Sequence, residues 1–283
     1  MRAVFTALFR LLIVAGFLAS TTANAGVMLR TESYAPDLLA DIYAPEQAGA
    51  GRPAVLLIHG GGWGAGGRSE FAELARWFAA QGAVAIAIDY RLSTAGHRWP
   101  AQRIDVQRAL AWIDRHAFEL GIDRTRIAAL GGSAGGHLAA WLAVDNAAGA
   151  RVKAVVSLWG PWDLTLPDAE LQPDAIGMLE TLLGPGRPGA REASPYFHIS
   201  RESAPVLLIH GLDDPLVPPS QAQRACARYR ETGARCELLE LPGEGHGLSR
   251  NEDVVRVANA VRAFLIRELL EAPSSPGAQH TVR

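Results

Sequence analysis

The chain has 283 residues, of which 49% are hydrophobic, 20% are charged and 7% are aromatic. This composition is that of a globular protein and excludes collagen-like, disordered and coiled-coil chains. Lys and Arg number 27 against 29 Asp and Glu, which gives a formal net charge of −2. Because no basic surplus exists to neutralise phosphates, we expect no nucleic-acid partner.

The first 25 residues have the three parts of a secretory signal peptide. Arg2 and Arg10 give a positive start, Leu11 to Ala19 is an unbroken apolar run, and Ala23-Asn24-Ala25 is a small-residue cleavage site. A membrane anchor would need about 20 apolar residues, and this run has nine. We expect cleavage after Ala25, a secreted or periplasmic protein, and no stable insertion in a membrane.

Past residue 25, short apolar runs alternate with stretches of helical periodicity. The expected strands are Ala54–His59, Ala83–Asp89, Arg126–Leu130, Val152–Leu158, Pro205–His210 and Cys236–Leu241. The expected helices lie near Ser69–Gln81, Ala101–His116, Ala134–Val144, Ser220–Thr232 and Glu252–Glu271. Continuous apolar runs are typical of parallel strands covered on both faces, so the pattern predicts a doubly wound, mostly parallel α/β sheet. Leu38–Tyr43 could add an antiparallel edge strand.

A proline-rich segment interrupts this alternation between about residues 160 and 200. It contains six prolines around one short helical stretch. An insertion of this kind after a strand is a candidate lid or substrate loop. We expect one domain over residues 26–272 with this lid-like insertion, followed by a flexible tail over 273–283.

The two cysteines, Cys226 and Cys236, are ten positions apart. In an oxidising compartment they could form a disulfide, and two buried thiols on a helix and the following strand are an equal alternative. Neither lies in a C-x-x-C motif or a His-rich cluster, so no zinc site is indicated.

The main chemical signal is Gly131-Gly132-Ser133-Ala134-Gly135-Gly136. It follows an apolar strand and begins an apolar helix, which is the context of a nucleophile elbow. The small neighbours allow a sharp turn at Ser133, and the helix N-terminus favours developing negative charge. A glycine-rich turn capped by serine is the simpler alternative, so the rest of the sequence must decide.

A second glycine-rich motif, His59-Gly60-Gly61-Gly62-Trp63, follows an earlier strand. Its adjacent N–H groups are unhindered by side chains, as an oxyanion hole requires. A phosphate-binding loop is disfavoured because the motif is not G-x-x-x-x-G-K-[ST] and no Lys follows.

An acid and a base occur later in the chain, in the order Ser, Asp, His. Asp213 and Asp214 follow one late strand, and His246 lies in a glycine-rich loop after the last strand. The carboxyl ends of parallel strands form the ligand-binding edge of an open α/β sheet. His246 could accept the proton of Ser133 while a carboxylate orients the imidazole. His59, His137 and His210 are interpreted as structural.

These motifs together resemble the α/β-hydrolase superfamily, in particular the esterases that carry HGGG-W and GGSAGG motifs and are related to hormone-sensitive lipase. The resemblance extends from about Leu38 to Leu269. It implies an α/β-hydrolase fold and a serine carboxylesterase that needs no metal or organic cofactor and acts on small-molecule esters.

The resemblance also assigns roles to individual residues. It implies Ser133 as nucleophile and His246 as general base. Asp214, rather than Asp213, becomes the triad acid, because the family pattern H-G-x-x-D-x-x-V-P aligns with residues 210–218. The implied oxyanion donors are the N–H groups of Gly61, Gly62 and Ala134.

The pocket is less well defined by the sequence. Trp63, Trp159, Trp162 and Val217 are candidates because they follow the oxyanion glycines or strand ends, although core packing is the simpler interpretation of a single tryptophan. The large N-terminal helical cap of lipase-like relatives has no counterpart between residue 25 and Leu38. We therefore expect an open site for small acyl groups.

Several other functions fit the same motifs. A carbohydrate acetyl or feruloyl esterase, an arylformamidase and a peptidase are alternatives among enzymes. The arylformamidase is disfavoured by the signal peptide, and the peptidase by the absence of residues for a propeller domain. A non-catalytic binding module on a hydrolase fold is disfavoured because the serine, histidine, acid and oxyanion glycines are all present. The oligomeric state cannot be derived from the sequence.

Overall fold

The computed structural model describes residues 26–47, 49–145 and 149–271. The expected signal peptide and the expected flexible tail lie outside the described residues. Within these ranges no helix is long and apolar enough to cross a bilayer.

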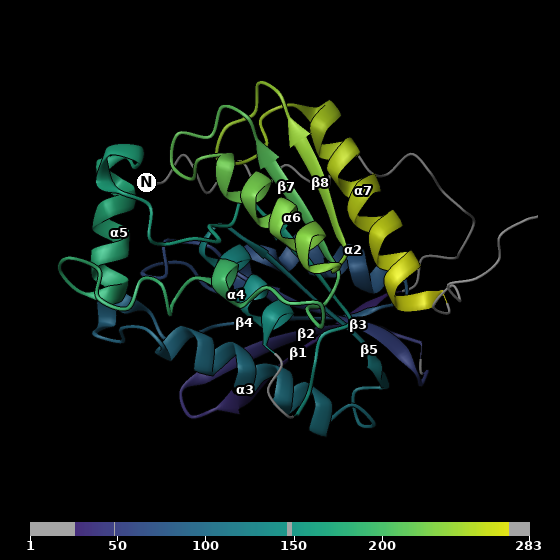
Figure 1. The fold of residues 1–283 in the computed structure, drawn as a ribbon. Helices are drawn as coiled ribbons and strands as arrows, with labels where there is room; N and C mark the ends of the chain where they lie inside the picture. Colours follow the sequence, from purple (N-terminus) through teal and green to yellow (C-terminus); the bar gives the residue numbers. More distant parts are fainter. Residues whose placement is uncertain (1–25, 48, 146–148, 272–283) are drawn as a thin grey trace, which may run out of the picture.

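One eight-stranded sheet, in the order β1-β2-β4-β3-β5-β6-β7-β8, forms the centre of the molecule (Figure 1). Its strands are β1 (Val27–Ala35), β2 (Leu38–Pro45), β3 (Arg52–Ile58), β4 (Val84–Ile88), β5 (Ile122–Gly132), β6 (Ala154–Leu158), β7 (Val206–Gly211) and β8 (Cys236–Leu241). The two pairs β1·β2 and β2·β4 are antiparallel, and all pairs from β4 to β8 are parallel. The predicted doubly wound, mostly parallel sheet is therefore confirmed.

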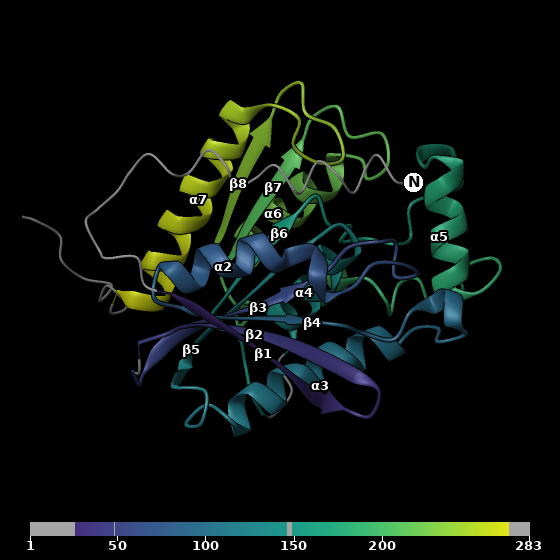
Figure 2. The same ribbon diagram turned by 180° about the vertical axis from the view of Figure 1, so that it is seen from behind.

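Helices cover both faces of the sheet. They are α2 (Ala72–Ala80), α3 (Ala101–Arg115), α4 (Ala134–Val144), α5 (Pro173–Leu183), α6 (Ser220–Thr232) and α7 (Asn251–Leu270), with short 3-10 helices η3 (Arg68–Phe71), η4 (Ser93–Ala95), η5 (Asp168–Glu170) and η6 (Pro195–His198). Helices α3, α4 and α6 share one apolar core with the sheet, whereas α2 and α7 share the other. Figure 2 shows α2 and α7 on the second face and α5 at one side of the molecule, where Leu179, Leu182 and Leu183 of α5 join the core of α3, α4 and α6.

Two strands differ from the expected pattern. β1 was not predicted because its sequence, Val-Met-Leu-Arg-Thr-Glu-Ser-Tyr-Ala, is largely exposed at the sheet edge and lacks a continuous apolar run. β5 begins at Ile122, four residues before the expected start. The sequence does not indicate this earlier start because the first residues of the strand include the polar Asp123, Arg124 and Thr125. An edge position or a polar strand end needs no buried apolar pattern.

The cysteines form a disulfide. Cys226 on α6 and Cys236 at the start of β8 are joined, with their Cα atoms 5.4 Å apart. The bond fastens α6 to the last strand, and it resolves the alternative that the sequence left open.

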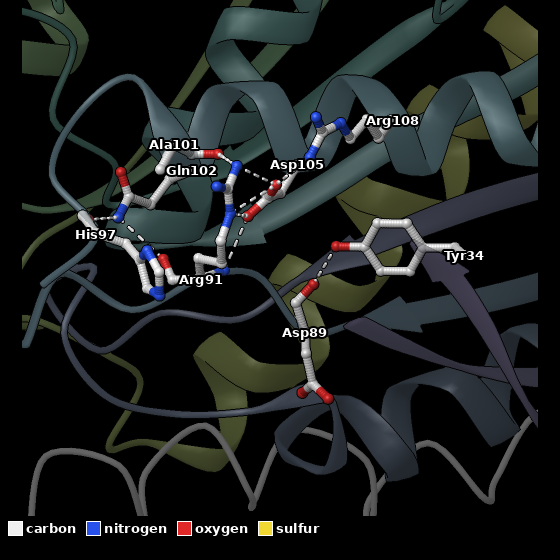
Figure 3. A network of polar contacts seen from close by, with 8 residues as sticks. All are labelled: Tyr34, Asp89, Arg91, His97, Ala101, Gln102, Asp105 and Arg108. Atoms are coloured by element: carbon white, nitrogen blue, oxygen red, sulfur yellow. Dashed lines mark hydrogen bonds and ion pairs between the residues drawn. The ribbon is translucent and has the colours of Figure 1, made fainter. Parts of the chain in front are cut away.

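A buried polar network holds the connection between β4 and α3 (Figure 3). Asp105, with no exposed surface, accepts hydrogen bonds from the Arg91 guanidinium at 2.7 and 2.8 Å and from the Arg91 N–H at 3.0 Å. Gln102 donates to the Arg91 carbonyl at 2.9 Å, and the Tyr34 hydroxyl donates to the Asp89 carbonyl at 2.5 Å. Charge-assisted, bidentate contacts of this kind fix a loop in one geometry.

This connection matters for the site because it supports the glycine-rich loop after β3. The Ser93 N–H donates to the Trp63 carbonyl at 2.8 Å, and the Thr94 hydroxyl donates to the Gly64 carbonyl at 2.6 Å. The network around Asp105 therefore helps to hold the backbone of Trp63 and Gly64 in place, through the hydrogen bonds that η4 donates to it.

Replacing Asp105 by Ala should destabilise the fold strongly. The substitution leaves Arg91 without its partner, and because the Arg91 side chain is 32% exposed the cost should be about 2–3 kcal/mol, below the about 3–5 kcal/mol of a fully buried pair. Urea unfolding followed by circular dichroism measures the loss. The control is Asp114→Ala on the same helix, which removes a solvent-exposed pair with Arg124 and should cost less than about 1 kcal/mol. Equal losses in the two variants would contradict the role given to Asp105.

Candidate active site

Ser133 lies at the turn between β5 and α4 in a conformation that few non-glycine residues adopt. Its φ is +54° and its ψ is −122°. Its N–H donates to the Leu158 carbonyl at 2.8 Å, which ties the turn to the end of β6. Strained backbone of this kind persists only where the surrounding structure holds it, and it is concentrated at functional sites.

The glycines around Ser133 are required by close packing of the backbone. A Cβ built on Gly135 would lie 2.0 Å from the Ile58 carbonyl oxygen at the end of β3. Any side chain there would separate α4 from β3. The G-x-S-x-G spacing thus brings the serine next to the loop that follows β3.

His246 reaches Ser133 from the loop between β8 and α7. Its Nε2 lies 2.8 Å from the Ser133 Oγ. Buried Glu244 shapes this loop by accepting hydrogen bonds from the Ser249 N–H and hydroxyl and from the Arg250 N–H, all within 2.9 Å. The loop that carries the His246 imidazole is therefore fixed by hydrogen bonds to Glu244.

Asp214 completes the line behind His246. Its Oδ2 lies 2.8 Å from the His246 Nδ1, and its Oδ1 accepts hydrogen bonds from the Leu216 and Val217 N–H groups at 2.9 Å. Because a carboxylate can only accept here, Nδ1 carries the proton and Nε2 is free to accept from Ser133. The neighbouring Asp213 is exposed.

The electrostatics keep Asp214 ionised. Burial raises the pKa of this carboxyl, but hydrogen bonds from His210 and His246 outweigh burial and hold the pKa at about 2. His210 is buried, with its Nε2 2.9 Å from the Val217 carbonyl and 3.3 Å from the Asp214 Oδ2. An anionic Asp214 can stabilise an imidazolium formed at His246.

The three expected oxyanion donors border two pockets that both contain Ser133. Gly62 and Ala134 lie beside Ser133 in one pocket, and Gly61 and Gly62 lie beside it in another. Among the described residues, the Gly61, Gly62 and Ala134 N–H groups donate none of the backbone hydrogen bonds found in turns and loops. Free N–H groups near a nucleophile can receive a developing oxyanion.

Trp63 anchors this loop through a buried histidine. The Trp63 Nε1 donates to the His137 Nδ1 at 3.1 Å, and the His137 Nε2 donates to the Ala193 carbonyl at 2.8 Å. Burial lowers the pKa of His137 to about 4, so the ring is neutral and can accept from Trp63. His59 has a structural environment too, stacked on Tyr90 with ring centroids 4.1 Å apart.

Two cavities meet at Ser133. The small pocket, of about 40 Å³, is bordered by Ala134, Val217 and apolar side chains of the 160–200 segment, including Leu164 and Leu179. The large cavity, of about 510 Å³, is bordered by His246, Trp159 and Phe71. Gly62, Ser133, Met178 and Leu216 border both. The segment from 160 to 200, with helix α5, forms much of the wall.

The four residues expected in the pocket have different positions. Trp63 and Val217 border the small pocket, and Trp159 borders the large cavity. The expectation for Trp162 is wrong: this side chain is 1% exposed, packs edge-on against Tyr229 of α6, and borders neither cavity. The chain direction after β6 points the Trp162 side chain into the core beneath α6.

Some functional neighbours could not be identified from the sequence. Gln221 of α6 is buried, accepts hydrogen bonds from the Trp162 and Asp163 N–H groups at 2.8 and 2.7 Å, and borders the small pocket. Glu70 of η3 borders the large cavity. Neither lies in a recognisable motif, and each reaches its cavity only through the placement of its helix around the sheet.

Comparisons with known proteins agree with this geometry. The BD-FAE family model matches residues 40–228, and the model described as TAP-like protein matches residues 186–276. The chain is 33% identical to the "Probable carboxylic ester hydrolase LipM" of Mycobacterium tuberculosis over 80% of its length and 57% of that protein. It is 34% identical to "Esterase LipC" of the same organism, over 69% and 53% respectively. The chain thus spans little more than half the length of these curated relatives.

Solved structures cover almost the whole described fold. Esterase 2 of Thermogutta terrifontis phosphonylated by sarin is 28% identical, with a TM-score of 0.76 over 89% of this chain and 98% of that one. The same esterase with butyrate bound is 29% identical, with a TM-score of 0.73 over 89% and 97%. A truncated carbohydrate esterase from gut microbiota is 26% identical, with a TM-score of 0.76 over 88% and 99%. On the match over residues 40–228, the chain belongs to the BD-FAE family of α/β-hydrolases.

Proposed function

We propose that the protein is a serine carboxylesterase that hydrolyses esters of small acyl groups. The observation that carries this proposal is the line from Ser133 through His246 to Asp214, with both hydrogen bonds 2.8 Å long. Ser133 shares its two pockets with Gly61, Gly62 and Ala134, whose N–H groups donate no turn or loop hydrogen bond to the backbone of the described residues. A binding module would not need this arrangement, because recognition alone requires neither a base nor an oxyanion hole.

The reaction proceeds through an acyl-enzyme. The Ser133 Oγ attacks the ester carbonyl while its proton passes to the His246 Nε2, and the Gly61, Gly62 and Ala134 N–H groups receive the oxyanion. As the tetrahedral intermediate collapses, the imidazolium gives this proton to the departing alkoxide oxygen. Water, deprotonated by His246, then attacks the acyl-enzyme and releases the carboxylic acid.

Each half of the substrate ester is assigned to one of the two cavities that meet at Ser133. The leaving oxygen must lie near the His246 Nε2, which protonates it, and His246 borders only the large cavity. The alcohol half therefore belongs there and the acyl chain in the small pocket. The small pocket has a volume of about 40 Å³, roughly three times that needed for one water. A short acyl chain fits in this volume, and a feruloyl group is too large for it. The related esterase whose structure contains bound butyrate supports the same preference.

Export to an oxidising compartment is part of the proposal. The disulfide between Cys226 and Cys236 supports it, because such bonds persist mainly in secreted and periplasmic proteins. The apolar N-terminal sequence with its small-residue cleavage site supports it independently.

Replacement of Ser133 by Ala should abolish esterase activity. Removal of the nucleophile in serine hydrolases costs about six orders of magnitude in turnover. Hydrolysis of p-nitrophenyl acetate, followed by absorbance, measures the loss, with circular dichroism as the test of folding. A folded Ser133→Ala protein that retained a tenth or more of the activity would refute the assignment.

The adjacent aspartates provide a matched control for the triad. Asp214→Asn should lower kcat by about 10⁴, because Asn does not hold the imidazole in the required tautomer. Asp213→Asn removes the same charge one residue earlier, from an exposed side chain, and should leave kcat within about twofold. Equal effects of the two substitutions would contradict the assignment of Asp214.

The size of the small pocket predicts a narrow acyl preference. The wild-type kcat/KM for p-nitrophenyl esters should fall at least about tenfold from butyrate to octanoate, because each unaccommodated methylene loses favourable burial. Leu179→Ala should enlarge the pocket and raise the octanoate-to-butyrate ratio. Leu183→Ala is the control, on the same helix and equally buried but bordering neither cavity, and it should leave the ratio unchanged. A flat chain-length profile in the wild type would contradict this account.

A further inference from the structure

Two of the three ionisable side chains that border the large cavity are carboxylates. Glu70 on η3 and Asp174 in the first turn of α5 border it from two different elements, and His246 is the only other ionisable side chain that does so among the described residues. Neither Lys nor Arg is among the residues that border it. A bound leaving group therefore lies in a cavity bordered by two carboxylates and by no Lys or Arg side chain.

Glu70 carries no compensating cation of its own. Arg68, two residues away, pairs instead with Asp41 at 2.9 Å and with Asp89 at 2.5 Å. The Glu70 carboxylate accepts a hydrogen bond from the Gly67 N–H, and burial raises the pKa of this carboxyl. Ordinary ion pairing thus does not explain why a half-buried carboxylate borders a substrate cavity.

The carboxylate lies close to the oxyanion loop. A Cβ built on Gly66, which has a φ of +95°, would lie 2.7 Å from the Glu70 Oε1. Gly66 comes three residues after Trp63 in the same loop, and its missing side chain leaves room for the Glu70 carboxylate and for the His59 imidazole, whose Nδ1 would lie 2.6 Å from the same Cβ. Glu70 and Ser133 line one cavity, so the Glu70 carboxylate borders the space that the alcohol half of a bound ester would occupy.

The remaining walls of the large cavity are apolar or aromatic. Phe71, Trp159, Met178 and Leu216 border it, with Gln172 as the only neutral amide. A neutral polyol needs hydrogen-bonding groups around most of its surface, whereas an alkylammonium needs apolar or aromatic contacts and a nearby anion. The lining of this cavity matches the second description.

We propose that the large cavity is a subsite for a cationic leaving group, in which Glu70 determines specificity for esters of amino or quaternary ammonium alcohols. The proposal rests on the proposed esterase function and deepens it by naming the chemistry of the alcohol half. Asp174, which is exposed, adds a weaker attraction at the outer side of the cavity.

The test compares two acetate esters of nearly the same shape. Acetylcholine carries a quaternary ammonium, and 3,3-dimethylbutyl acetate replaces its nitrogen by carbon. The measured quantity is the ratio of kcat/KM for the cationic ester to that for the neutral ester. We expect the wild type to favour the cation by about five- to tenfold at low salt, from one partly solvated charge pair, and the ratio to approach one as ionic strength rises.

Glu70→Gln keeps the shape of the side chain and should bring the ratio close to one. Glu73→Gln is the matched control, because Glu73 is exposed on α2 and pairs with Arg76 on the surface, so its ratio should equal that of the wild type. Inhibition of neutral-ester hydrolysis by tetramethylammonium supplies a second readout that requires no variant. It should be competitive in the wild type.

The kcat/KM ratio and the activity on neutral esters together distinguish failure of the cationic subsite from failure of the esterase function. A ratio near one in the wild type, together with no inhibition by tetramethylammonium, would overturn the proposal while normal hydrolysis of the neutral ester left the esterase function intact. A cationic preference that survives in Glu70→Gln would overturn the role of Glu70. Hydrolysis of neither ester, nor of p-nitrophenyl acetate, would instead refute the proposed function.

Discussion

The hydrogen bond between the Ser133 Oγ and the His246 Nε2 is 2.8 Å long and joins residues that are 113 positions apart. The fold must therefore hold two distant segments of the chain in a fixed relative position. One end is fixed by the turn between β5 and α4, where Ser133 has a φ of +54° and its N–H is bonded to the end of β6. The other end is fixed by Asp214, which is buried, ionised and bonded to two backbone N–H groups. A parallel sheet makes this possible because the carboxyl ends of β5, β7 and β8 lie along one edge.

The oxyanion loop depends on supports that lie outside the triad. The Trp63 side chain is held by His137 of α4, and the Trp63 backbone is held by Ser93. Ser93 belongs in turn to the connection that Asp105 and Arg91 fix through a buried ion pair. Ser133 and the loop that contains Trp63 thus share α4 as a support, since Ser133 precedes that helix and His137 lies one turn into it. Preorganised donors are effective because they need not reorganise during the reaction.

The parts of the site that follow from local sequence were predictable. Continuous apolar runs identify the parallel strands, and the glycine motifs identify the two turns at their carboxyl ends. Features set by distant contacts were not predictable. β1 is a polar edge strand without an apolar pattern, and Trp162 faces Tyr229, which comes from a helix more than 60 residues later in the chain. Glu70 and Gln221 border the cavities at Ser133 only because η3 and α6 are placed around the sheet. The volumes of the two cavities depend on the packing of the 160–200 segment.

The central claim, that Ser133 is the nucleophile activated by His246, is tested most directly by locating a covalent adduct. The protein is treated with paraoxon, digested and analysed by mass spectrometry, while residual esterase activity is measured on the same samples. The account predicts one phosphoryl group on Ser133, formed in proportion to the loss of activity and at a greatly reduced rate in the His246→Ala variant. Complete inactivation with the phosphoryl group on another residue, or full activity after Ser133 has been modified, would contradict it.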